Sequence, residues 1–171
     1  MNITIDLVRK DEKEILRNLL EKYLYEFSQY EKTDVNSLGL YGYNYLDHYW
    51  TEDRRYPCFI KAENKLAGFA MVNDYPEVKI KADYTMSEFF ILFKYRNSGI
   101  GKYAADYLFD KYKGKWQLKY HPKNTVSEKF WLHVVDDYTR GKYELLKDNP
   151  QAAYADGTLG NILIFDTPYI S

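Results

Sequence analysis

The stretch YRNSGIGK, residues Tyr95–Lys102, decides which fold this chain adopts. It follows the apolar run FFILF, residues 89–93, and precedes YAADYLFDKY, residues 103–112. The apolar run is typical of a buried strand, and the segment after the glycines is typical of an amphipathic helix. Glycine lets a ligand approach the backbone closely, because it has no side chain. The junction therefore predicts a cradle of backbone amides for an anion; without those flanks it would be a simple turn.

The start of a helix is suited to phosphate, because its first four amides have no partner within the helix and its dipole is positive there. Gly99 and Gly101 would let a pyrophosphate reach these amides, and Arg96 and Lys102 would add charge at the rim. The rest of the predicted loop consists of Asn97, Ser98 and Ile100.

Two better-known phosphate motifs are excluded by their spacing. GIGKYAAD lacks the third glycine of the dinucleotide-binding fingerprint, and RNSGIGKY has neither the four-residue gap nor the hydroxyl residue of the P-loop. The pattern that remains is Arg-x-x-Gly-x-Gly after a central strand. A pattern this short also fits two glycines that merely start a helix.

Length and composition predict a single domain over residues 1–171, since 171 residues with 46% hydrophobic content can bury one sizeable core. A net charge of −1 gives no electrostatic footprint for nucleic acid or for an anionic membrane. The N-terminal residues do not resemble a signal peptide, and no apolar run approaches 18 residues. We therefore expect a cytoplasmic protein that binds neither nucleic acid nor membrane.

The cysteine and histidine content argues against disulfides and metals. A single cysteine, Cys58, excludes an internal disulfide, and we expect it to be buried in a strand. The three histidines, His48, His121 and His133, do not have the spacing of metal ligands. We expect no metal.

Hydrophobic periodicity predicts strands that alternate with helices. The expected strands cover residues 2–8, 56–62, 65–73, 84–93, 115–121 and 160–166. The expected helices cover residues 11–30, 43–50, 99–112 and 125–135, the last with Val126, Phe130 and Val134 on its buried face. A hairpin within this order predicts an α/β fold with one central, twisted, mixed and mostly antiparallel sheet flanked by helices.

Two ordered motifs give the chain a family resemblance. SEFFILFKYRNSGIGKYAADYLF, residues 87–109, resembles the central motif of the GNAT superfamily of acetyl-CoA-dependent N-acetyltransferases, with an acidic residue, Glu88, eight positions before Arg96. NTVSEKFW, residues 124–131, resembles that family's segment of an asparagine followed by an aromatic residue. The predicted order of elements fits the family over the whole chain.

The resemblance implies acetyl-CoA as co-substrate and an amine as acceptor. Backbone groups of Phe89, Phe90 and Ile91 would flank the pantetheine and acetyl group, and the amides of residues 97–102 would bind the pyrophosphate. Asn124 would contact the pantetheine arm, and Lys129 would lie near it.

Acetyl transfer to an amine requires a neutral nucleophile. An amine with a pKa of about 10.4 must lose a proton at a cost of about 4.6 kcal/mol at pH 7. Glu88 is the first candidate for the base, directly or through a water. The alternative is a structural carboxylate paired with a basic residue or a tyrosine. Glu26 and His121 are weaker candidates.

The family pattern breaks at Trp131, where many relatives carry a tyrosine. An indole N–H donates a hydrogen bond but cannot supply a proton, so Trp131 cannot be a general acid. Tyr120 or Tyr138 could substitute for it. The leaving thiolate costs only about 2 kcal/mol at neutral pH, so an acid matters less than a base.

The sequence defines the acceptor less well than it defines the co-substrate. The first two helices and their connection could form an aromatic wall around a small amine, or their tyrosines could simply cap the core. The aromatic residues are Tyr25, Tyr41, Tyr43, Tyr45, His48 and Tyr49, and the acidic ones are Glu26, Glu31, Asp34 and Asp47.

Two other functions stay open: an acyl-CoA-binding sensor or interaction module without turnover, and a nucleotide-binding or RNA-modification-associated domain. The latter lacks the usual basic and aromatic stripe. The exposed strand edge of such a sheet is compatible with a homodimer.

Overall fold

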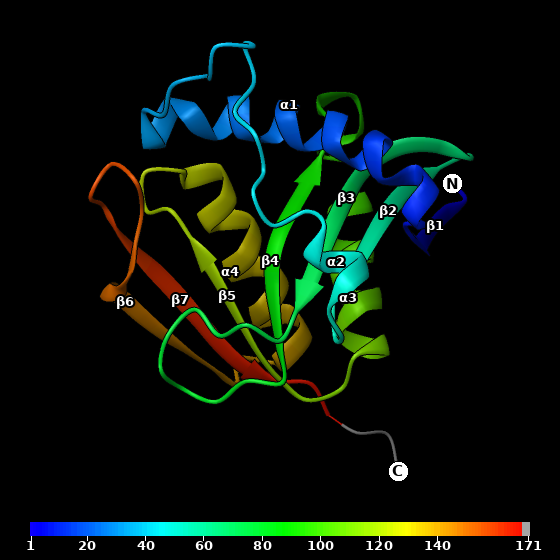
Figure 1. Ribbon diagram of the computed structural model, residues 1–171. Coiled ribbons are helices and arrows are strands. Elements are labelled where there is room, and N and C mark those ends of the chain that lie inside the picture. Colours follow the sequence, from blue (N-terminus) through cyan, green and yellow to red (C-terminus); the bar gives the residue numbers. More distant parts are fainter. Residues whose placement is uncertain (169–171) are drawn as a thin grey trace.

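The computed structural model describes residues 1–168, which form one seven-stranded sheet in the order β1-β2-β3-β4-β5-β7-β6 (Figure 1). The strands are β1 (Ile3–Leu7), β2 (Tyr56–Ala62), β3 (Lys65–Asn73), β4 (Tyr84–Ile91), β5 (Lys115–Tyr120), β6 (Tyr143–Ala153) and β7 (Leu159–Asp166). The helices are α1 (Lys13–Glu31), α2 (His48–Thr51), α3 (Ile100–Lys111) and α4 (Thr125–Thr139), with 3-10 turns η1 (Lys10–Glu12) and η2 (Phe93–Tyr95).

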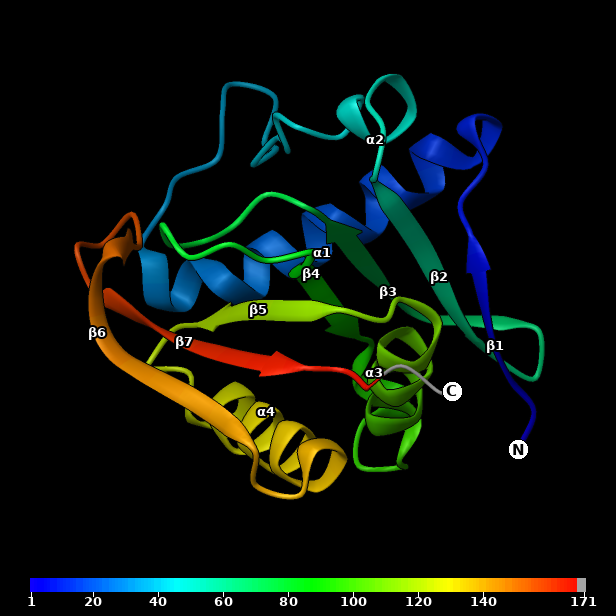
Figure 2. The ribbon, with the colours of Figure 1, turned by 90° about the horizontal axis from the view of Figure 1, so that it is seen from below.

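The sheet is mixed and mostly antiparallel, as the sequence predicts. Only β4 and β5 pair in parallel, and every other neighbouring pair is antiparallel. The helices lie on both faces of the sheet: α1 and α2 cover one face, and α3 and α4 cover the other (Figure 2). We call these the α1/α2 face and the α3/α4 face.

Each face has its own core. On the α1/α2 face, Leu16, Leu20 and Tyr23 of α1 pack on Phe69 of β3. These α1 residues recur at helical spacing, so one stripe of the helix is buried and its other side remains polar. On the α3/α4 face the core includes Cys58, whose predicted burial in a strand is confirmed.

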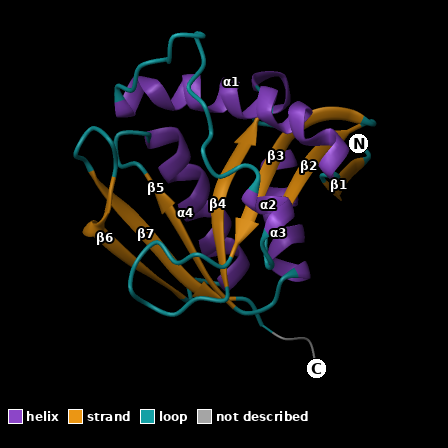
Figure 3. Cartoon of the chain, viewed as in Figure 1, coloured by secondary structure: helices purple, strands orange, loops and turns teal. Residues whose placement is uncertain are grey.

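Three connections border the α1/α2 face. The loop between α1 and α2, residues 32–47, and the loop between β3 and β4, residues 74–83, both cross this face (Figure 3). The tip between β6 and β7, residues 154–158, lies near the C-terminal end of α1, where the Tyr30 ring is 5.7 Å from that of His121 at the end of β5. These segments surround the C-terminal parts of β4 and β5.

The helix expected over residues 43–50 is confined to His48–Thr51, and the structure corrects two further sequence predictions. Val126, expected inside, is 72% exposed, and the buried stripe of α4 is formed by Trp131, Val134 and Val135. Val126 precedes Trp131 by five residues, which places the two roughly 140° apart around the helix. The second error is an omission, since the pattern predicts no strand at β6.

Candidate active site

An opening between β4 and β5 is the central feature of the site. The two strands pair only from Tyr84 with Trp116 to Met86 with Leu118. Beyond that point they diverge, as Figure 1 shows, and β4 continues along β3 while β5 continues along β7. A register shift at Ser87 marks the start of the divergence. Among the described strands, none pairs with the edge of β4 that faces β5 after Met86.

Helix α3 begins beyond the C-terminal end of β4. The chain turns into the helix through two left-handed residues, Asn97 at φ 57° and Gly99 at φ 84°. A Cβ built on Gly99 would meet no atom of the described chain within 4 Å, so the space in front of the helix is open. The first amides of α3 have no acceptor within the helix. An open, positively polarised helix end of this kind is suited to an anion such as phosphate.

Gly101 serves a different purpose. A Cβ on Gly101 would lie 3.0 Å from the ring of Phe130, on α4. Glycine at this position therefore lets α3 pack closely on α4. Of the remaining loop residues, Ile100 is fully buried, and the Ser98 hydroxyl donates to the carbonyl of Tyr95.

The two basic residues of the loop are paired with protein carboxylates. The guanidinium of Arg96 donates two hydrogen bonds of 2.7 Å to the Glu26 carboxylate and one of 2.7 Å to the Ile91 carbonyl. Lys102 lies 2.6 Å from Asp106 and 2.8 Å from Asp137. The hydrogen bonds of Arg96 join α1 to the end of β4, and the ion pairs of Lys102 join α3 to α4. The positive potential of the loop therefore comes mainly from the helix end.

The predicted pantetheine contacts come from β4 and from the start of α4. On β4, Phe89 and Ile91 point into the α3/α4 core, whereas Phe90 points into the α1/α2 core. Asn124 caps α4, because its side-chain oxygen accepts from the amide of Ser127 at 3.1 Å. Lys129 is exposed on α4.

Trp131 belongs to the core. It is 6% exposed, and its ring centroid lies 5.0 Å from that of Phe89 and 4.8 Å from that of Phe130. The two tyrosines that could replace it as a general acid form hydrogen bonds with other residues. The Tyr138 hydroxyl donates to Asp110 at 2.8 Å, and the Tyr120 hydroxyl lies 3.4 Å from the side-chain nitrogen of Asn161.

Glu88 lies on the α1/α2 face, just past the register shift. Its side chain is half-buried, and the Tyr43 hydroxyl donates to it across 3.5 Å. Burial raises the pKa of Glu88 from its ordinary 4.5 to about 7, against the opposing effect of a hydrogen bond from Tyr23; the charge of Glu77 raises it further. A carboxyl with this pKa exchanges a proton readily at neutral pH.

The other candidate bases are occupied. Glu26 is held by Arg96. His121 is fully buried, with Nε2 donating to Asp156 at 3.2 Å and Nδ1 accepting from the amide of Lys123 at 3.2 Å. Both ring nitrogens of His121 are therefore used by neighbouring groups.

Only part of the predicted aromatic wall faces Glu88. Tyr43 and Tyr49 turn inward, and burial raises the pKa of both, that of Tyr49 to about 12. Tyr25 and Tyr45 are 71% and 60% exposed. The other members lie around this group: Tyr41 and His48 are half-buried, Glu31 is half-buried at the end of α1, Asp34 is exposed, and Asp47 pairs with Lys13.

Sequence reasoning missed three residues of this face, Lys119, Glu77 and Tyr154. The ammonium of Lys119 on β5 lies 3.4 Å from the Glu77 carboxylate and 4.5 Å from the centroid of the Tyr154 ring. No local pattern marks them, because they come from three separate segments that meet only in the folded sheet.

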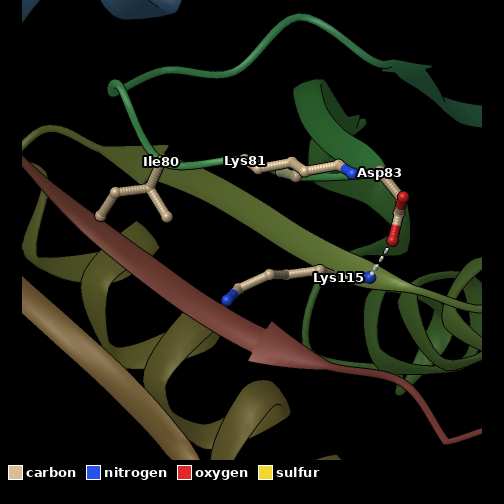
Figure 4. Close-up of a pocket in the computed structure, with 5 residues that line it drawn as sticks. Ile80, Lys81, Asp83 and Lys115 are labelled. Carbon is tan, nitrogen blue, oxygen red and sulfur yellow. Dashed lines mark hydrogen bonds between the residues drawn. The ribbon is translucent and has the colours of Figure 1, made fainter.

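A hollow of about 330 Å³ lies elsewhere. Its lining includes Ile80, Asp83 and Lys115, at the end of β4 and β5 opposite to the opening (Figure 4). There the backbone amide of Lys115 donates to Asp83 at 2.8 Å. In residues 1–168 no helix is long and apolar enough to cross a membrane, and no group of three His, Cys, Asp or Glu side chains is placed to hold a metal ion.

Solved structures with the same fold include several acetyltransferases. An acetyltransferase from Thermus thermophilus is 14% identical, with a TM-score of 0.68 and 97% of each chain covered. The PaiA N-acetyltransferase of Thermoplasma acidophilum, solved with coenzyme A, is 14% identical, with a TM-score of 0.58 over 97% of this chain and 99% of that one. Spermidine N-acetyltransferase of Vibrio cholerae, solved with CoA and spermine, is 10% identical, with a TM-score of 0.63 over 96% and 95%.

At these identities the structural likeness establishes the fold alone. A comparison with curated proteins found no match. The model of the acetyltransferase (GNAT) family matches residues 14–134, which include α1, the opening between β4 and β5, the loop before α3 and most of α4. The chain belongs to the GNAT family of acetyltransferases.

Proposed function

We propose that this protein transfers the acetyl group of acetyl-CoA to the primary amine of a small molecule or peptide. The observation that carries the proposal is Glu88, a half-buried carboxyl with a pKa of about 7, at the opening between β4 and β5. From Glu88 the chain runs along β4 to the turn before α3, whose N-terminal end has no side-chain cap, and this connection supports a shared site for the base and the anion cradle.

The chain offers a place for each part of the co-substrate. The amides of residues 97–102 would hold the pyrophosphate, with Gly99 leaving room in front of the helix. The free edge of β4 at residues 89–91 would hydrogen-bond the amides of the pantetheine arm, and Asn124 and Lys129 lie on the helix that follows β5. When bound, acetyl-CoA supplies the activated acetyl group as a thioester.

Glu88 would remove the proton from the acceptor amine. Deprotonating an ordinary amine at pH 7 costs about 4.6 kcal/mol, and a nearby carboxylate that accepts this proton offsets part of the cost. The hydroxyls of Tyr43 and Tyr23 hold the carboxylate in position by hydrogen bonds. The proton passes to Glu88 directly or through one water.

The site works without a dedicated general acid. Trp131 is buried among Phe89 and Phe130 and has no proton to give, and the thiolate leaving group costs only about 2 kcal/mol at neutral pH. Two of the similar structures support the class of reaction: PaiA N-acetyltransferase was solved with coenzyme A, and spermidine N-acetyltransferase was solved with CoA and spermine.

Calorimetric titration with acetyl-CoA, followed by thiol release against a panel of amines, tests the proposal. We expect binding, and release of thiol with at least one amine. Binding without release on any amine would instead support an acyl-CoA-binding sensor, and absence of binding would leave residues 95–102 as only a turn.

A further inference from the structure

Glu88 and Lys119 lie on opposite sides of the same opening. Met86 and Leu118 form the last pair between β4 and β5, and Lys119 is the next residue on β5. The neighbours of Lys119 on its strand, Leu118 and Tyr120, belong to the α3/α4 core, so the Lys119 side chain points to the α1/α2 face. Glu88 points to the same face.

Lys119 is held in place by two of the segments that border this face. Its ammonium lies 3.4 Å from Glu77 and 4.5 Å from the centroid of the Tyr154 ring, and its side chain is 25% exposed. The loop that carries Glu77 is fixed on the same strand, because the buried side chain of Gln117 accepts from the amide of Glu77 at 3.0 Å and donates to the carbonyl of Ile80 at 2.7 Å. The lysine is therefore a built-in cation with a defined position.

The charged groups that act on Glu88 come from every element around it. The carboxylates of Glu77 and Glu31 oppose its ionisation, and the ammonium of Lys119 favours it. Lys119 also favours the ionised form of Glu31. The groups that face Glu88 are Tyr23 and Glu31 of α1, Tyr43 of the following loop, Tyr49 of α2, Glu77 of the β3–β4 loop, Lys119 of β5 and Tyr154 of the β6–β7 tip.

We propose that Lys119 is a positioning and specificity-determining residue, which supplies the fixed positive charge of the acceptor site and thereby restricts the acceptor to a single ammonium group. More than one cation would be attracted by the three carboxylates of this face, those of Glu77, Glu31 and Glu88. The Lys119 ammonium already occupies the position beside Glu77. An acceptor with two ammonium groups would have to displace Lys119 or bind beside it against charge repulsion. This inference rests on the proposed acetyl transfer at Glu88.

The pH dependence of thiol release tests the effect on Glu88. In Lys119→Met the acidic limb of kcat/KM should move to higher pH by about half to one pH unit, since a neighbouring positive charge is lost. Lys119→Arg should restore the wild-type midpoint. Lys115→Met is the matched control, because Lys115 lies four residues earlier on β5, beside the hollow of Figure 4, and its loss should leave the profile unchanged. An unshifted midpoint in Lys119→Met would overturn the proposal.

Acceptor preference gives a second readout. The ratio of kcat/KM for a diamine to that for a monoamine of the same length should rise about tenfold in Lys119→Met, because the second ammonium would take the vacated place. An unchanged ratio would contradict the specificity role.

Failure of this inference is distinguishable from failure of the proposed function. If the wild-type protein releases no thiol with any amine, the side-chain carboxyl resonance of Glu88, assigned by its loss in Glu88→Gln, is titrated by NMR in wild type and in Lys119→Met. A higher midpoint in the variant would still support the charge role of Lys119, and equal midpoints would remove it.

Discussion

At the scale of single residues, Glu88 combines a chemical property with a position. Burial keeps its carboxyl partly protonated at neutral pH, and the end of the β4–β5 pairing places it at the opening between these two strands. A surface carboxylate, with its pKa near 4, would be ionised but a poor base at pH 7. The raised pKa is therefore the property on which the proposed role of Glu88 depends.

In the proposed mechanism Glu88 acts in its deprotonated form, so kcat/KM should rise with pH through an apparent pKa of about 7. Initial rates of thiol release between pH 5.5 and 8.5 with a fixed amine would measure this limb. In Glu88→Gln the limb should disappear, leaving only the steeper dependence on the ionisation of the amine itself. A wild-type kcat/KM that does not change slope near pH 7 would contradict the role of Glu88.

The same pKa has a consequence for stability. The folded-state pKa of about 7 lies above the ordinary 4.5, so the folded state favours the protonated form. That contribution is fully present below about pH 4.5 and is lost as the pH rises to 7. Only wild type loses this contribution when the pH is raised from 4.5 to 8. The unfolding free energy of Glu88→Gln, taken relative to that of wild type, should therefore be about 1–3 kcal/mol higher at pH 8 than at pH 4.5. Urea denaturation at the two pH values measures this, and a constant difference between the proteins would argue against it.

At the scale of elements, the turn into α3 separates two roles of glycine. Gly99 adopts φ 84° beside open space, whereas Gly101 lies under the ring of Phe130. Gly99→Asn should keep the unfolding free energy within about 1 kcal/mol, since asparagine tolerates this backbone conformation. It should weaken acetyl-CoA binding at least about tenfold, because the side chain enters the space that a phosphate needs.

The matched variant is Gly101→Val, which should instead destabilise the fold by about 1–3 kcal/mol through its clash with Phe130. Thermal unfolding and calorimetry on both variants separate the two effects. Unchanged acetyl-CoA affinity in Gly99→Asn would remove the end of α3 from the binding site.

The link between α1 and β4 depends on Arg96. Its guanidinium is bidentate to Glu26 and also bonds the carbonyl at the end of β4, with about a quarter of each side chain exposed. Arg96→Met should cost about 1–3 kcal/mol of unfolding free energy, because it leaves a half-buried carboxylate without its partner. Glu26→Gln should cost less.

A double-mutant cycle of Arg96→Met with Glu26→Gln should show coupling above about 0.5 kcal/mol. Additive effects would mean that the pair does not join the two elements. Because α1 borders the acceptor side, we also expect Arg96→Met to raise KM for the amine more than it weakens acetyl-CoA binding.

At the scale of the whole molecule, patterns local in sequence predicted most of the fold. The hairpin of β2 and β3 falls where alternation and a short turn predict it, and β4, α3 and β5 agree to within two residues at nearly every end. The strand β6 was not predicted, because Asp148 at φ 49° and Pro150 interrupt its alternating pattern. Its register with β7 also shifts twice.

The site was predictable where its residues lie in one segment and hidden where they do not. Glu88 and the glycines share one motif, so they could be proposed together, although Gly101 packs against Phe130 instead of facing open space. Arg96 also belongs to that motif, yet its partner, Glu26, is 70 residues away and gives it a structural role that spacing could not reveal. Lys119, Glu77 and Tyr154 meet only because β5 lies between β4 and β7.

The most direct measurement is thiol release from acetyl-CoA, against a panel of amines, by wild type and by Glu88→Gln, with the acetyl-CoA affinity of each measured by calorimetry. Wild type should release thiol with at least one amine, and Glu88→Gln should be slower by about a hundredfold or more at the same acetyl-CoA affinity. Equal rates in the two proteins would return Glu88 to a structural role. Acetyl-CoA binding without release on any amine would contradict acetyl transfer.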